Sequence, residues 1–166
     1  MCIRDRTLTD QNLTVDSGSI SVANAILLAA ATTGTITATI ATTESVDSLK
    51  TLYDTGETNA YTITITSDAA DTQQSTAAEF NAINNATSLA VNATSVTELA
   101  SSNISDIKTL LTAGNDTNQF TATSFGSLAT VTVADTTLDV SDLNDSIAQA
   151  NTCLLYTSPS PRDGLL

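Results

Sequence analysis

The sequence predicts an α/β fold in which short strand–helix repeats stack as a right-handed solenoid with a parallel sheet. Three observations support this expectation. Helix-start signals recur along the chain, stretches of period-two hydrophobicity separate them, and the resulting order favours parallel strands joined by crossovers, which are right-handed in nearly all known proteins. A mainly-β solenoid and a single compact α/β domain are the alternatives, because a chain of 166 residues is long enough for one domain.

Five short strings share the features of a helix N-terminus. Each starts with a residue whose side-chain oxygen can accept from the free N–H groups of a first helical turn, and each has an apolar residue at its fifth position. Thr76 and Glu79 also fit a capping box. The strings are SVANA, SVDSL, TAAEF, NISDI and DVSDL, which start at Ser21, Ser45, Thr76, Asn103 and Asp139. Apolar residues then recur at helical spacing, which predicts five short amphipathic helices.

Between the expected helices the hydrophobic pattern changes to period two. Apolar residues alternate mostly with threonine, which predicts half-buried strands. The three runs are Ile36, Ala38, Ile40; Tyr61, Ile63, Ile65; and Leu89, Val91, Ala93. The outer face would then carry a ladder of threonines that resembles the flat arrays of ice-binding β-solenoids, although the high β-propensity of threonine explains the pattern without that function.

Glycines stand where three of the helices should end. They are Gly34, Gly56 and Gly114, and each is expected to adopt the left-handed conformation that closes a helix.

The repeat units are expected near residues 13–34, 35–59, 60–87, 88–116 and 117–152. A longer repeat is visible as well, since LTVDSGSISV from Leu13 matches VTVADTTLDV from Val131, 118 residues later. Four short units therefore make one long unit, and residues 7–152 are expected to be a fragment of an array.

Both ends of the chain differ in composition from the rest. All arginines, cysteines, prolines and the methionine lie in residues 1–6 or 153–166. The strings MCIRDR and CLLYTSPSPRD look like translations of a transposase sequencing adapter. We therefore expect residues 1–6 and 153–166 not to be native protein, and we exclude them from the fold prediction.

Charge and composition exclude several functions. Five basic and 18 acidic residues give a net charge of -13, which disfavours nucleic-acid binding because that binding needs Lys and Arg against phosphate. The chain has no histidine, so imidazole is absent as a base or metal ligand. The longest apolar run, residues 22–31, is too short to cross a bilayer, which predicts no membrane insertion. No catalytic constellation is present, so the chain is not expected to be an enzyme.

Carboxylates are the only plentiful ionisable groups, which makes calcium the first ligand to consider. The densest cluster, and the candidate calcium site, consists of Asp135, Asp139, Asp142 and Asp145. The chain lacks both an EF-hand loop and the glycine-rich nonapeptide of calcium-binding β-rolls. Asp139 and Asp142 fit better as a helix cap and its partner, so no cofactor is expected other than this weak calcium candidate.

The units as a whole resemble repeats of known proteins. The strings VANAILLAAATTGTITATIATT, NAYTITITSDA and ATSLAVNATSVTELA look like repeats of giant cell-surface or secreted proteins of marine cyanobacteria and other aquatic bacteria. Those proteins include adhesion- and motility-associated members often grouped with RTX-type exoproteins. The resemblance covers essentially all of residues 7–152, and it implies no catalytic motif.

Taken together, these observations predict a non-catalytic structural repeat segment of a large extracellular or cell-surface protein, acting as a spacer or adhesive stalk. Its expected partners are neighbouring repeats of the same chain. The alternative is a calcium- or glycan-binding module on the same scaffold, with surface glycans or calcium as the partner.

Overall fold

The computed structural model describes residues 10–55, 59–66 and 71–135. Residues 1–6 and 153–166, expected not to be native, lie outside this part, as do residues 136–152 of the unit expected at 117–152. The elements in chain order are β1 (Leu13–Thr14), α1 (Val22–Ala31), β2 (Ile36–Thr39), α2 (Val46–Leu49), the 3₁₀ helix η1 (Lys50–Thr55), β3 (Ala60–Thr62), the 3₁₀ helix η2 (Thr72–Gln74), α3 (Ala77–Asn84), β4 (Glu98–Ser102), α4 (Ile104–Gly114) and β5 (Thr130–Val133). The protein is thus a mixed α/β structure, as predicted.

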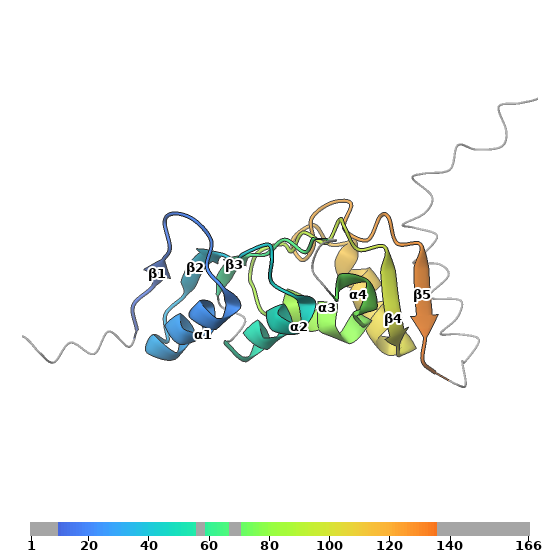
Figure 1. The fold of residues 1–166 in the computed structure, drawn as a ribbon, viewed down its shortest axis with the longest axis horizontal. Helices are drawn as coiled ribbons and strands as arrows, with labels where there is room; N and C mark the ends of the chain where they lie inside the picture. The colour runs from blue at the N-terminus through green and yellow to red at the C-terminus, as the bar shows by residue number, and fades with distance from the viewer. Residues whose placement is uncertain (1–9, 56–58, 67–70, 136–166) are drawn as a thin grey trace, which may run out of the picture.

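Both sheets are parallel, as the order of strands and helices predicts. One sheet has the order β1-β2-β3 and the other pairs β4 with β5. Isolated parallel bridges, Thr64 to Asn92 and Val91 to Phe120, link later segments to the ladder of the first sheet. Figure 1 shows the four α-helices following one another along the long axis in chain order. Each strand therefore pairs with a segment from the next part of the chain.

The helices start where the sequence places them. Ser21, Ser45, Thr76 and Asn103 are the N-cap residues of α1 to α4. The Ser21 and Ser45 hydroxyls accept from the backbone N–H three residues on, while the Asn103 side chain makes no such bond. Both halves of the capping box between Thr76 and Glu79 are present. Helix starts are therefore set by local sequence.

The core is a continuous line of apolar side chains between helices and strands. The inward residues of the first two period-two runs are 4% exposed or less. In the third run Val91 and Ala93 are buried, but Leu89 is 40% exposed, so the prediction is wrong there. Phe125 packs edge-on against Phe80 and Phe120, with ring centroids 5.7 and 5.0 Å apart.

The predicted role of the glycines is wrong at two positions. α1 ends in an extended residue, Thr32, and neither Gly34 nor Gly114 has a positive φ. Gly34 is instead required by close packing, because a Cβ there would lie 2.3 Å from the backbone oxygen of Gln11. Gly114 lies within the last turn of α4, and Gly56 lies outside the described residues.

Candidate functional site

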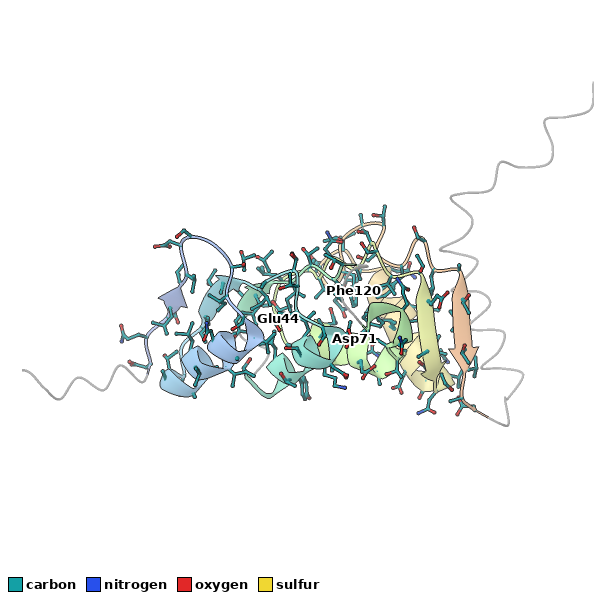
Figure 2. All side chains as sticks on the ribbon, in the orientation of Figure 1. Glu44, Asp71 and Phe120 are labelled. Atoms are coloured by element: carbon teal, nitrogen blue, oxygen red, sulfur yellow. The ribbon has the colours of Figure 1, made fainter. Side chains whose placement is uncertain are left out.

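The first backbone N–H of each α-helix donates to a side chain from a later part of the chain. In every case the acceptor lies 22 to 31 residues further on, about one strand–helix unit. The contacts are Val22 N to Glu44 Oε1 at 3.1 Å, Val46 N to Asp71 Oδ1 at 2.8 Å, Ala77 N to Ser102 Oγ at 2.9 Å and Ile104 N to Asp135 Oδ2 at 2.6 Å. We call these four contacts the inter-unit caps; Figure 2 labels two of the acceptors, Glu44 and Asp71.

The inter-unit caps complete helix ends that the local N-caps leave half satisfied. An α-helix begins with four N–H groups that have no partner within the helix, and the N-cap side chain takes only the N2 or N3 group. Asp71 supplies both of its oxygens, since Oδ2 also accepts from Asp47 N at 2.8 Å. Three of the four acceptors are carboxylates, which the positive end of a helix dipole favours. Each unit therefore depends on the next unit for a complete helix N-terminus.

The predicted calcium cluster is placed only in part. Asp135 is the acceptor for the N-terminus of α4, which commits one of its two oxygens to a backbone N–H. Asp139, Asp142 and Asp145 lie outside the described residues. Within residues 10–55, 59–66 and 71–135, no group of three or more acidic or other metal-binding side chains comes together.

The inter-unit caps were missed by the reasoning from sequence. The signal was present, because Glu44 and Ser102 each stand directly before an N-cap residue. Asp71 does not follow that rule, since it lies five residues before Thr76.

A second set of side chains links the starts of successive strands. Asn12 Oδ1 accepts from Thr35 N and Asn59 Oδ1 accepts from Ile36 N, both at 2.9 Å. Thr87 Oγ1 accepts from Tyr61 N at 3.0 Å. Asn59 is 3% exposed, so its amide is an interior link between the starts of β2 and β3.

One cluster of charges also joins two units. Lys50 on η1 forms ion pairs with Asp47 of its own unit and with Glu79 of α3, the latter at 2.7 Å. The hydrogen bond from Lys50 is the main reason that the pKa of Asp47 is lowered. The pKa of Lys50 is raised, mainly by its hydrogen bond to Asp47 and secondly by its hydrogen bond to Glu79. Glu79 thus serves both the capping box of α3 and the contact with the preceding unit.

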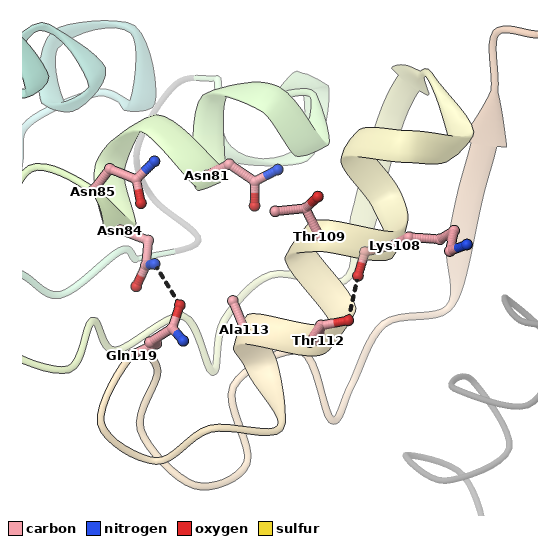
Figure 3. Close-up of a pocket in the computed structure, with 8 residues that line it drawn as sticks. All are labelled: Asn81, Asn84, Asn85, Lys108, Thr109, Thr112, Ala113 and Gln119. Atoms are coloured by element: carbon pink, nitrogen blue, oxygen red, sulfur yellow. Dashed lines mark hydrogen bonds between the residues drawn. The ribbon is translucent and has the colours of Figure 1, made fainter.

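A polar cleft lies between α3 and α4. Its volume is about 430 Å³, and a second hollow of about 300 Å³ adjoins it, sharing Asn84, Asn85 and Gln119 in its lining. Figure 3 shows Asn81 of α3 opposite Thr109 of α4, while Asn84 points toward Gln119 on the loop after α4. Lys108 is the only ionisable residue among those described as lining the two hollows.

The amide of Asn84 lies at the junction of the two hollows. Asn84 is 9% exposed, and its Nδ2 donates to Gln119 Oε1 at 3.0 Å. Its Oδ1 is buried and has no hydrogen-bond partner, which is unusual because most buried polar atoms in proteins are paired. Gln119 Nε2 in turn donates to Asp116 Oδ2 at 3.2 Å, so the Asp116 carboxylate holds the side chain of Gln119 in place.

The outer threonine face is interrupted. Thr37 on β2 lies beside Thr14 on one side and Ala60 on the other, while Thr39 lies beside Thr62. Thr14, Thr37, Thr39 and Thr62 are exposed, as predicted. The row through Thr37 ends after two threonines, so these strands do not build a continuous hydroxyl array.

Comparison with known proteins gives no matching family model, no matching curated protein and no matching solved structure. Among the described residues no helix has the length and apolar character needed to span a membrane.

Proposed function

We propose that the chain is a non-catalytic structural segment of a large extracellular or cell-surface protein, in which strand–helix units stack as a right-handed solenoid and act as a spacer or adhesive stalk. The observation that carries this proposal is the set of inter-unit caps. In a repeat array each unit is stabilised mainly by its neighbours. Shared helix N-termini, strand hydrogen bonds and one apolar core would provide that stabilisation.

The exposed ends of the described part also support stacking on further units. Val131 and Val133 on β5 are 39% and 37% exposed, whereas Ile36 and Ala38 on the interior strand β2 are 0% and 4% exposed. The segment that matches β5 at the 118-residue spacing contains β1, which is an edge strand of the other sheet. An edge strand with apolar side chains is a surface for another strand.

The acidic surface suits an extended stalk. A net charge of -13 keeps copies apart in solution and disfavours close approach to anionic surfaces and nucleic acid. The resemblance of the repeats to giant surface proteins of aquatic bacteria supports a location outside the cell. Antibodies against the chain should therefore label intact source cells without permeabilisation.

The stacking proposal is tested by chains that contain one, two and three copies joined at the 118-residue spacing. If the units stack, the maximum dimension measured by small-angle X-ray scattering grows linearly with copy number, and the free energy of unfolding grows faster than the number of copies because each junction adds a new interface. Copies that tumble independently, each as stable as a single chain, would contradict the proposal.

A further inference from the structure

We propose that the free edge of β1 binds the β4–α4 end of a second copy of this chain, in the place that β5 occupies within a single chain. This inference rests on the proposed stacking function and adds to it a partner surface and a register. β1 is an edge strand, and it lies at the opposite end of the long axis from β4 and β5 (Figure 1). The partner is a second copy because β5, which already pairs with β4, matches the β1 segment in sequence.

The contact between β5 and β4 is a template for the proposed contact. Residues 131–140 match residues 13–22 at the 118-residue spacing, so Val131 corresponds to Leu13. Val131 pairs with Leu99 of β4 in a parallel register. β1 of a second copy is therefore expected to lie parallel to β4, with Leu13 beside Leu99.

The two matching strands use opposite edges for their hydrogen bonds. The β1 segment donates to the β2 segment through the backbone N–H groups of Leu13 and Val15, both at 2.9 Å. The β5 segment donates to the β4 segment through Thr130 and Ala134, at 3.3 and 2.8 Å, and these two correspond to even-numbered positions of the β1 segment. Successive N–H groups of a strand point to opposite edges, so the N–H of Thr14 points to the free edge of β1. One strand of this sequence can therefore pair with a β4 strand on one side and with its own β2 on the other.

The second copy also carries an oxygen that can cap α4. Asp135 Oδ2 accepts from the backbone N–H of Ile104, and Asp135 corresponds to Ser17 at the 118-residue spacing. Ser17 is exposed in the loop after β1. A serine already has this role at α3, where Ser102 Oγ accepts from Ala77 N at 2.9 Å. Ser17 of a second copy is therefore expected to replace Asp135 as the inter-unit cap of α4.

One core position of α1 is less buried than its equivalents. The residue seven positions after the N-cap is Leu52, Ile83 or Leu110 in the later units, and each of these is 0% exposed. The equivalent Leu28 of α1 is only partly buried. Among the described residues α1 has no helix before it, whereas α3 and α4 each pack against the helix before them. The β4–α4 end of a second copy would supply the missing helix, and covering Leu28 would add apolar burial to the strand contact.

Docking displaces β5 of the first copy, so two strands compete for β4. β5 belongs to the same chain as β4, which gives it a high effective concentration, and association is therefore expected only in concentrated solution. Val131 and Val133 of β5 nevertheless remain 39% and 37% exposed. β1 of a second copy arrives with β2 and α1 packed behind it, so it covers more of the β4–α4 end than β5 does by itself.

The test measures association of the full chain by sedimentation equilibrium. The protein is compared from about 1 μM to about 1 mM in about 0.5 M NaCl, because salt screens the repulsion between copies. We expect reversible association at the high end of this range. Amide hydrogen exchange at residue resolution then locates the contact. The N–H of Thr14 should exchange at least about tenfold more slowly in the associated sample, whereas the N–H of Leu13, which already donates to the β2 segment, should change less.

Three variants with different expectations make the assignment specific. Thr14→Pro removes the N–H that points to the free edge, so it should weaken association at least about tenfold, or about 1.4 kcal/mol, and leave the thermal melt of dilute protein unchanged. Thr14→Val keeps that N–H and should associate like the unmodified chain. Ala134→Pro removes the bond from the β5 segment to Ser102 O, which makes β4 more accessible and should strengthen association.

Two results would overturn the proposal. One is a monomer throughout the concentration range for both the unmodified chain and Ala134→Pro. The other is equal association of Thr14→Pro and Thr14→Val, because a different surface would then join the copies. If Thr14→Pro melts earlier, the exchange rate of the Thr14 N–H in the unmodified chain decides, and an unchanged rate in an associated sample contradicts the proposal. Failure here is distinct from failure of the stacking function, since covalently joined copies can extend linearly even when separate chains stay monomeric.

Discussion

Replacing Asp71 by alanine should destabilise the junction between α2 and the following unit. Asp71 accepts from Val46 N and Asp47 N, both at 2.8 Å, so the substitution removes two charge-assisted hydrogen bonds from one helix N-terminus. Loss of a helix cap costs about 0.5–2 kcal/mol, and hydrogen bonds to charged groups contribute about 1.5–3 kcal/mol. Because Asp71 is half-buried and water replaces part of the loss, we expect a cost of about 2 kcal/mol.

The assay is urea unfolding followed by circular dichroism, together with amide hydrogen exchange. A loss of 2 kcal/mol lowers the melting temperature by about 4–8 °C in a chain of this size. Asp71→Asn keeps one acceptor and should lose about half as much stability. Asp16→Ala, which removes one exposed carboxylate from the loop after β1, is the control for charge and should change stability by less than about 0.5 kcal/mol.

Hydrogen exchange locates the effect. In Asp71→Ala the amides of Val46 and Asp47 should exchange faster, while the amide of Ile104, which donates to Asp135, keeps its protection. If Asp71→Ala is no less stable than Asp16→Ala, or if the protection of Val46 is unchanged, the inter-unit caps do not couple the units and the reasoning is refuted.

Three further predictions concern single positions. Gly34→Ala should cost about 1–3 kcal/mol in urea unfolding, because its Cβ would lie 2.3 Å from Gln11 O; an unchanged midpoint would contradict the close packing. Thr123 is a β-branched residue with φ 76, so Thr123→Gly should stabilise by about 0.5–1 kcal/mol where Thr123→Ala gives less. The pKa of Asp116 is lowered, chiefly by the backbone N–H of Asn118, so its contribution to stability is present above the usual aspartate pKa of about 3.9 and is lost as the pH falls below it. Asp116→Asn should therefore flatten the decline in unfolding free energy on acidification, measured by urea midpoints at several pH values.

The helix starts and the inward strand faces were predictable because they depend on neighbours in the sequence. Ser45 caps its helix through the N–H three residues away, and Ile36 and Ala38 point inward because strand side chains alternate. The prediction that Leu89 is buried was wrong, because alternation determines which residues share a face of a strand but not whether other side chains pack over that face. The predicted left-handed conformation of Gly34 was wrong for a related reason. The glycine is required by the close approach of the Gln11 backbone, which comes from another part of the chain.

The candidate sites divide in the same way. The acidic cluster was visible in the sequence because its residues are close together along the chain, yet Asp135 serves a helix that starts 31 residues earlier. The cleft between α3 and α4 gave no signal, because Asn84 and Gln119 are 35 residues apart and only the packing of two units brings their amides together.

The sequence by itself determined the four described helix starts, the first two strand runs and the parallel order of the strands, since caps and hydrophobic periods act within a few residues. It did not indicate β4, and its third expected strand run contains only isolated bridges. Only the tertiary structure decided which side chain completes each helix N-terminus and where polar groups meet between units. A backbone N–H accepts whichever oxygen lies within reach in space, and Glu44, Asp71, Ser102 and Asp135 reach those groups from different positions before the next helix. Contacts between residues 22 to 31 positions apart in the sequence therefore complete the four helix N-termini.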